Sequence, residues 1–179
     1  MSLHDDAEIK RLIEKHWGRV RSTTSAEKKQ QIERLAALLK QDSGDLMHGQ
    51  LLFKKNCGVC HTLFGEGGRT GPKLTGYERT NLKFLLPAIV DPSAAIREEF
   101  TNFLVLTNDG RTVTGLIDKQ DPRTVTIRLV NNETTLINRD DIEVLKALDV
   151  SIMPEGLMKK LSDQETQDLL AYLISNAPK

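Results

Sequence analysis

The 179-residue sequence has little of several features, and each shortage excludes a class of protein. No run of apolar residues approaches the ~18–20 that a helix needs to cross a bilayer, so no membrane-inserted segment is predicted. Lysine plus arginine and aspartate plus glutamate number 25 each, so the formal net charge is zero. This balance gives no electrostatic footprint for nucleic acid or for an anionic membrane surface. What remains is an ordinary globular composition, with 39% hydrophobic and 28% charged residues.

The two cysteines are only three positions apart, and a histidine follows them. Cys57, Cys60 and His61 form the pattern C-x-x-C-H, which is the attachment signature of a c-type haem. Two thiols at this spacing can add across the two vinyl groups of one porphyrin edge, and the imidazole that follows can bind the iron. The motif therefore predicts one covalently attached haem c per chain, held by Cys57 and Cys60 and ligated by His61.

Three other interpretations compete for the cysteine pair. A redox dithiol of the thioredoxin type belongs after a strand, whereas residues 49–55 have a helical pattern. A structural zinc site needs four ligands, and the sequence has neither further cysteines nor a His-x₃₋₅-His pair. A disulfide between Cys57 and Cys60 stays open on the cysteine count alone.

Apolar residues at helical spacing predict most of the regular structure. Residues 5–17 and 24–40 are predicted as an N-terminal helical hairpin over residues 1–42, the second helix starting with a capping box of Thr24 and Glu27. The further helices are expected at about 45–56, at 81–90, from Asp91-Pro92-Ser93 to Arg97, and at about 163–175 after a capping box of Ser162 and Glu165.

The pattern changes between residues 100 and 146, where short alternating segments are separated by turn residues. Such spacing predicts a small antiparallel β-barrel, SH3-like in size, inserted into a haem-binding domain of residues 43–179. The expected fold class is therefore mostly α, with this β insertion and the N-terminal hairpin. The insertion either covers the haem edge or offers a docking surface to a partner, and cover is the favoured interpretation.

Several of these motifs together resemble the class I cytochromes c. The glycine and the phenylalanine of Gly49-x-x-x-Phe53 precede the cysteine motif by the family's spacing, and Gly71-Pro72-x-Leu74 follows it. The resemblance implies that Gly49 lets the first helix of the domain cross the last one closely. It also implies that the Pro72 carbonyl accepts a hydrogen bond from the proximal imidazole and that Leu74 lines the haem edge.

The same resemblance implies that Met153 is the sixth iron ligand, because Met-Pro occurs in the loop before the last helix. A thioether is a soft neutral donor that favours reduced iron. Met158 is the other candidate ligand. Met153 could instead be a structural methionine that fills a gap in the core. His16 and His48 are also possible ligands in principle, but a core and a surface histidine are the favoured interpretations.

The order of parts over residues 45–175 resembles the haem-binding domain at the C-terminal end of membrane-bound dehydrogenase-like proteins of planctomycetes and verrucomicrobia. This implies a non-catalytic electron carrier with His61 and Met153 as axial ligands, served by a redox partner protein or a fused dehydrogenase domain. The alternative is a haem sensor or gas-binding module with an open distal position. Haem c is attached after export, so a periplasmic or otherwise exported protein is expected. The first residues, Met1–Asp6, show no signal peptide, so the sequence is expected to be a piece of a longer chain.

Overall fold

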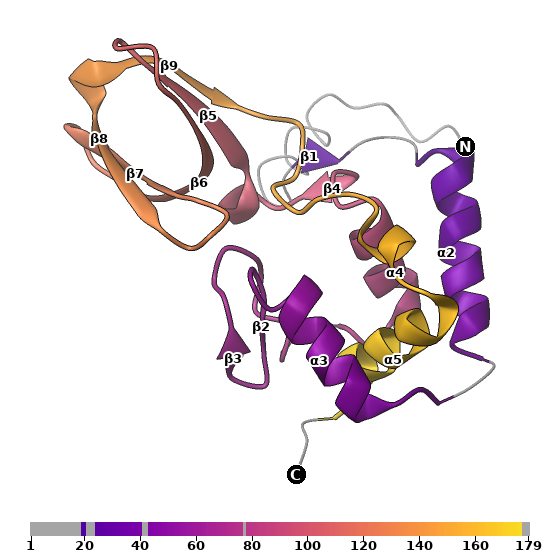
Figure 1. The fold of residues 1–179 in the computed structure, drawn as a ribbon. Helices are drawn as coiled ribbons and strands as arrows, with labels where there is room; N and C mark the ends of the chain where they lie inside the picture. The colour runs from indigo at the N-terminus through magenta and orange to yellow at the C-terminus, as the bar shows by residue number, and fades with distance from the viewer. Residues whose placement is uncertain (1–18, 21–23, 41–42, 77, 177–179) are drawn as a thin grey trace. The chain divides into compact units, whose positions relative to one another are not determined.

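The computed structural model describes residues 19–20, 24–40, 43–76 and 78–176 (Figure 1). Contacts divide the chain into two compact units. We call residues 24–92, 130–132 and 153–179 the helical unit, and residues 93–129 and 133–152 with the strand at 19–20 the strand unit. Among the described residues, no helix has both the length and the apolar character that a membrane span requires.

The helical unit contains the four α-helices of the described residues. In chain order they are α2 (Ala26–Leu38), α3 (Leu46–Asn56), α4 (Leu82–Val90) and α5 (Asp163–Ile174). A short hairpin of β2 (Thr62–Leu63) and β3 (Glu66–Gly67) follows α3, and a 3₁₀ turn, η3 (Leu157–Lys160), precedes α5.

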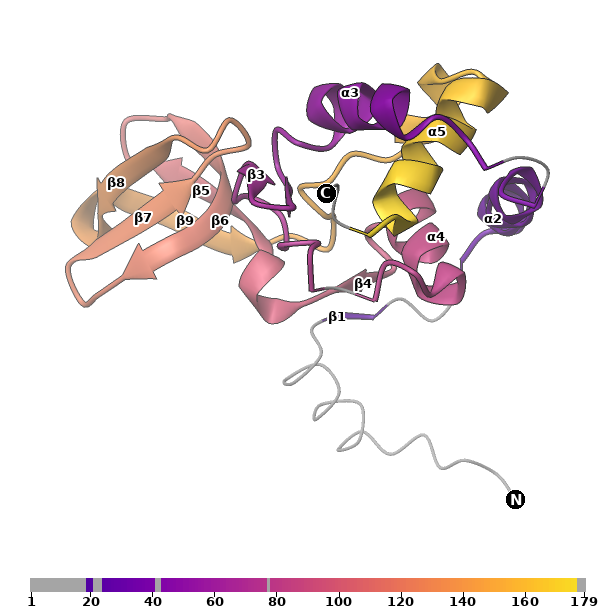
Figure 2. The same ribbon diagram turned by 90° about the horizontal axis from the view of Figure 1, so that it is seen from below.

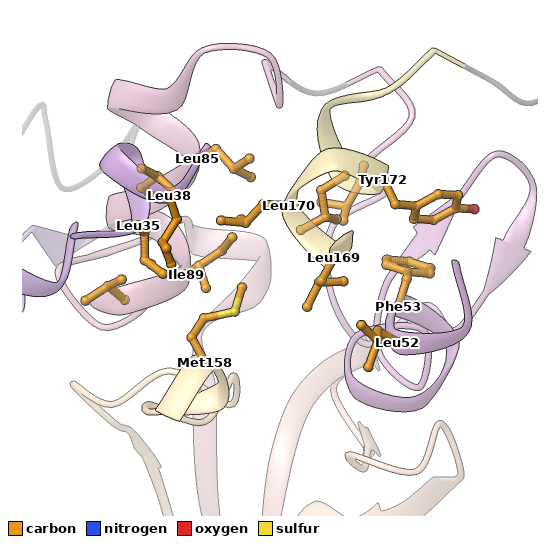
Figure 3. Close-up of a cluster of buried hydrophobic side chains, with 14 of the residues drawn as sticks. Leu35, Leu38, Leu52, Phe53, Leu85, Ile89, Met158, Leu169, Leu170 and Tyr172 are labelled. Atoms are coloured by element: carbon orange, nitrogen blue, oxygen red, sulfur yellow. The ribbon is translucent and has the colours of Figure 1, made fainter. Parts of the chain in front are cut away.

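One apolar cluster holds the helices of this unit together. The ring centre of Phe53 on α3 lies 5.7 Å from that of Tyr172 on α5, with the two ring planes tilted by 50°, and Figure 3 shows the two side chains next to each other. On the other side of α5, leucines from α2 and α4 surround Met158 of η3 (Figure 3). The buried members are Leu35, Leu38, Leu52, Phe53, Leu63, Leu74, Leu85, Leu86, Ile89, Val90, Met158, Leu169, Leu170, Tyr172 and Leu173.

Helix α3 crosses α5 closely at Gly49 (Figure 2). A Cβ atom built on Gly49 would lie 2.1 Å from the carbonyl oxygen of Asp168 and 2.8 Å from the Cβ atom of Tyr172. Only glycine leaves room for two backbones at this distance. The close approach that the resemblance implies for Gly49 is therefore present.

The strand unit contains a five-stranded antiparallel sheet and a two-residue pairing. The sheet has the order β8-β7-β6-β5-β9, so the last strand returns to pair with the first (Figure 1). Its core consists of four buried aliphatic residues, Val105, Val125, Ile127 and Ile137. The strands are β1 (Arg19–Val20), β4 (Ala95–Ile96), β5 (Asn102–Thr107), β6 (Thr112–Gln120), β7 (Thr124–Arg128), β8 (Thr134–Asn138) and β9 (Ile142–Ala147).

The expectation of a mostly α chain is wrong. The described residues contain nine strands beside four α-helices, and the five strands of the large sheet form a unit with its own core. The short helix expected from Asp91 to Arg97 is also absent, because Ala95–Ile96 forms β4 and pairs with β1 instead. That pairing joins segments more than 70 residues apart, so local sequence signals do not reveal it.

The helix termini were predicted unevenly. The capping box of Ser162 and Glu165 at α5 is confirmed, with both reciprocal hydrogen bonds present. The box of Thr24 and Glu27 is wrong, because Ser25 caps α2 and its hydroxyl accepts from the amide of Lys28. The helix expected at residues 5–17, the first of the N-terminal hairpin, lies outside the described residues, together with His16.

Candidate functional site

The C-x-x-C-H stretch begins at the residue that caps α3. Cys57 is the C-cap of the helix, and its amide and that of Gly58 both donate to the carbonyl oxygen of Phe53, at 2.8 and 2.7 Å. The amides of Cys60 and His61 then donate to the carbonyl of Cys57, at 3.1 and 2.9 Å. These bonds hold the two thiols and the imidazole on one compact turn that continues the helix.

The imidazole of His61 is held in one orientation by a backbone carbonyl. Its Nδ1 atom donates to the carbonyl oxygen of Pro72 over 2.9 Å, which is the hydrogen bond that the resemblance implies. Burial lowers the pKa of His61, while the hydrogen bond to Pro72 acts in the opposite direction. The ring is therefore favoured as a neutral imidazole with its proton on Nδ1, and Nε2 is the nitrogen that can bind a metal.

A glycine-rich loop lies directly against this turn. A Cβ atom on Gly71 would lie 2.6 Å from Cε1 of the His61 ring, and one on Gly68 would lie 2.0 Å from the carbonyl oxygen of Val59. Gly67 has a positive φ of 115°, and a Cβ atom there would lie 2.1 Å from the carbonyl oxygen of His61. The loop thus needs glycine because its backbone packs on the motif without any side chain between them.

The two cysteines are free thiols, so the disulfide left open by the cysteine count is not formed here. Burial, with a smaller contribution from Cys60, raises the pKa of Cys57 to about 12. Burial also raises the pKa of Cys60. Reactive dithiols have a lowered thiol pKa, so this environment disfavours a redox dithiol. Among the described residues, no group of three or more His, Cys, Asp and Glu side chains could hold a metal ion.

Asn132 completes the site, and sequence reasoning missed it. Its side chain donates to the carbonyl of Val59 at 2.7 Å and accepts from the amide of Arg69 at 2.7 Å and from the hydroxyl of Thr70 at 3.1 Å. Asn132 has a positive φ of 66°, a conformation that asparagine tolerates better than most residues. Its turn groups with the helical unit. The pair Asn131-Asn132 signalled a turn, but no pattern indicated what the side chain would bind.

The two candidate sulfur ligands differ in their surroundings. Met158 on η3 is 4% exposed, and its side chain points among the leucines and isoleucine of the cluster in Figure 3. Met153 is partly buried and packs against the edge of the same cluster, as Cys57 does. Leu74 is one of the buried members of that cluster. The geometry therefore places Met158 in the core and leaves Met153 at its border.

The remaining described histidine, His48, has a structural partner. Its Nδ1 atom lies 2.7 Å from a carboxylate oxygen of Asp168, which is 2% exposed. The other oxygen of Asp168 accepts from the amide of Asp45 at 2.8 Å and from the side chain of Gln164 at 2.9 Å. His48 thus links the start of α3 to α5, in agreement with its interpretation as a surface histidine.

Comparison with protein-family models gives one match, to the family described as cytochrome c, over residues 46–177. The matched range includes both cysteines, His61, Pro72, Leu74 and Met153. A search of curated proteins finds none that matches this sequence.

Proposed function

This chain belongs to the cytochrome c family, and from that premise we propose that it carries electrons through one haem c with His61 and Met153 as axial ligands. The family function is electron transfer by a covalently bound haem, and such a domain is an electron carrier rather than a catalyst. The observation that carries the proposal is the hydrogen bond from Nδ1 of His61, the histidine of the cysteine motif, to the carbonyl oxygen of Pro72. This bond leaves Nε2 as the atom that can bind the iron.

The residues present fit this cofactor. Cys57 and Cys60 are free thiols on the same turn as His61, as two thioether bonds and one proximal ligand require. A bound haem supplies an iron that alternates between the ferric and ferrous states. The chain orients the imidazole through Pro72, and the apolar cluster that includes Leu74 lowers the local dielectric and excludes water.

Met153 is the better candidate for the second axial ligand. Met158 is buried in the core with residues of α2, α4 and α5. If its side chain moved out to a cofactor, an empty cavity would remain in the core. Met153 borders the cluster and precedes Pro154, whose ring restricts the backbone and whose nitrogen has no proton to donate. This arrangement supports an iron without an open position, which fits electron transfer better than gas binding.

The electron partner is proposed to be a redox protein or a dehydrogenase domain fused to this one. The support is the order of motifs along residues 45–175, which resembles that of haem domains attached to dehydrogenase-like proteins. Haem c is attached outside the cytoplasm, so we propose a periplasmic or otherwise exported location.

The test is the optical spectrum of protein made together with the export and haem-attachment machinery. A pyridine haemochrome assay should give one haem per chain with thioether bonds. The ferric protein should be low-spin, with the weak methionine-to-iron charge-transfer band at the red edge of the visible spectrum. Met153→Leu should abolish that band, while the matched Met158→Leu variant, which keeps the core volume, should retain it.

Two outcomes would contradict the proposal. Survival of the band in Met153→Leu would remove Met153 from the iron. Rapid, tight binding of carbon monoxide by the ferrous wild type would show an open distal position and would support the sensor alternative instead.

A further inference from the structure

We infer that α2 holds the loop that carries Met153, with Lys28 as a positioning residue for that ligand. The inference rests on the proposed ligation by His61 and Met153. It concerns a helix that ends before the first residue of the cytochrome c match, which spans residues 46–177. The family therefore assigns α2 no role, and the role must come from its contacts.

Lys28 connects α2 to two other segments at once. Its Nζ atom lies 2.7 Å from a carboxylate oxygen of Asp91 and 2.7 Å from one of Glu155. Asp91 caps the C-terminus of α4, whereas Glu155 lies two residues after Met153. Partial burial acts to lower the pKa of Lys28, but the hydrogen bonds that its ammonium group donates to Asp91 and Glu155, with the charges of both carboxylates, outweigh it and raise the pKa. The ammonium group thus bridges the end of α4 and the methionine loop.

The two halves of this bridge differ in burial. The side chain of Asp91 is 1% exposed and that of Lys28 is 20% exposed, while the Glu155 side chain is 47% exposed. A charge pair with a buried partner is screened little by solvent, whereas an exposed pair gains less. The contact with Asp91 therefore fixes Lys28 in place, and the contact with Glu155 transfers this fixed position to the loop.

Two further ion pairs connect α2 to the segment between the methionine loop and α5. Glu27 lies 3.0 Å from Lys159, and Arg34 pairs with Asp163 at the start of α5. The partners at 155, 159 and 163 are evenly spaced from the methionine loop to α5. Each exposed pair alone is worth little, but together they align one helix along the whole segment.

The far end of α2 is fixed by packing rather than by charge. Leu35 and Leu38 are buried in the apolar cluster, and the carbonyl of Leu38 accepts from the side chain of Gln167 on α5 at 2.9 Å. By contrast, the loop from Met153 to Gly156 has no helix or strand, and Gly156 has a positive φ of 76°. A helix anchored in the core therefore contacts this loop through Lys28, so losing the Lys28–Glu155 contact should loosen Met153 before the helices unfold.

The experiment uses the haem-loaded protein and follows the methionine charge-transfer band during heating, beside global unfolding by far-UV circular dichroism. Glu155→Gln is the decisive variant, because it weakens the contact with the loop and keeps the pair of Lys28 with buried Asp91. In Glu155→Gln and in Lys28→Met the band should disappear at a lower temperature than in the wild type, ahead of global unfolding. Carbon monoxide should bind the ferrous forms roughly three- to tenfold faster, a change equivalent to ~0.7–1.4 kcal/mol in the population of the open form.

Two further variants separate a positioning role from a general charge effect. Lys28→Arg should keep the temperature at which the band disappears and the carbon monoxide rate close to those of the wild type, because arginine can contact both carboxylates. Lys29→Met, at the exposed neighbouring position on α2, should match the wild type.

The outcomes distinguish the two proposals. If the wild type shows the band but neither Glu155→Gln nor Lys28→Met changes its stability or the carbon monoxide rate, the role of α2 is overturned and the ligation stands. If the band and the helices are lost together in these variants, Lys28 is only a structural residue and the inference is also overturned. A wild type without the band overturns both proposals.

Discussion

The sharpest test of the helical unit is the substitution Gly49→Ala at the crossing of α3 and α5. The added Cβ atom would lie 2.1 Å from the carbonyl oxygen of Asp168, 2.8 Å from its carbonyl carbon and 2.8 Å from the Cβ atom of Tyr172. None of these atoms can rotate away, because all belong to the backbone or are attached directly to it. An ordinary contact begins at about 3.5 Å, so one helix must move by more than ~1 Å.

The expected cost follows from two opposing effects. Overpacking a core position costs about 1–3 kcal/mol, and a clash with backbone belongs at the upper end of that range. Alanine returns about 1 kcal/mol because it favours the helix over glycine. The net loss should therefore be about 2 kcal/mol in the free energy of unfolding. For a chain of this length that corresponds to a fall of roughly 4–8 °C in Tm.

The measurement is urea and thermal unfolding of the haem-loaded protein, followed by far-UV circular dichroism. The control is Gly76→Ala, because a Cβ atom at Gly76 would meet no atom of the described residues within 4 Å and its φ is not positive. This variant should be neutral or slightly stabilising. A Gly49→Ala protein that unfolds at or above the wild-type temperature would refute the close crossing.

Two other predictions concern Asn132 and Asp168. Asn132→Gly removes three side-chain hydrogen bonds, so it should lower the free energy of unfolding by ~1–3 kcal/mol and speed deuterium exchange at the Arg69 amide. Asn132→Asp keeps the acceptors and loses the donor, so its effects should be intermediate. Unchanged exchange in both variants would contradict this prediction. Burial alone would raise the pKa of Asp168, but hydrogen bonds from Asp45 and His48 outweigh it and lower the pKa. The stability that the Asp168 carboxylate contributes is therefore complete above about pH 4 and is lost as pH falls through the lowered pKa. Asp168→Asn should thus unfold more easily than the wild type near neutrality, and the two should become equally stable in acid. A constant difference in the free energy of unfolding from pH 7 to pH 3 would refute this.

The sequence was most informative where the contacts are local or where the cofactor chemistry requires fixed residue types at a fixed spacing. The cysteine motif and Gly71-Pro72 lie within 16 residues, and the resemblance that they carry implied the hydrogen bond between His61 and Pro72. Helices α3 and α5 were predicted from periodicity and from the capping box at Ser162. The resemblance to class I cytochromes c, carried in part by Gly49, implied the crossing, and only glycine allows two helix backbones to approach so closely.

The parts that escaped prediction depend on partners that are far away in the chain. Lys28 and Glu155 are 127 residues apart, and Asn132 and Val59 are 73 apart. Each of these residues is ordinary in its local sequence, because lysine in a helix and asparagine in a turn need no special explanation. The same reason accounts for β4, whose residues favour a strand only because a second short segment pairs with it.

The hydrogen bonds of the glycine-rich loop also bear on the order in which the protein can assemble. The amides of Gly68, Gly71 and Leu74 donate to carbonyls only ten to twelve positions earlier, so these loops close rapidly and at a small entropic cost. The backbone around His61 can thus take shape from residues 57–74 alone, before Asn132 adds its hydrogen bonds to this loop. The loop that holds the imidazole is therefore a local structure, and its formation does not depend on the distant segment that carries Met153.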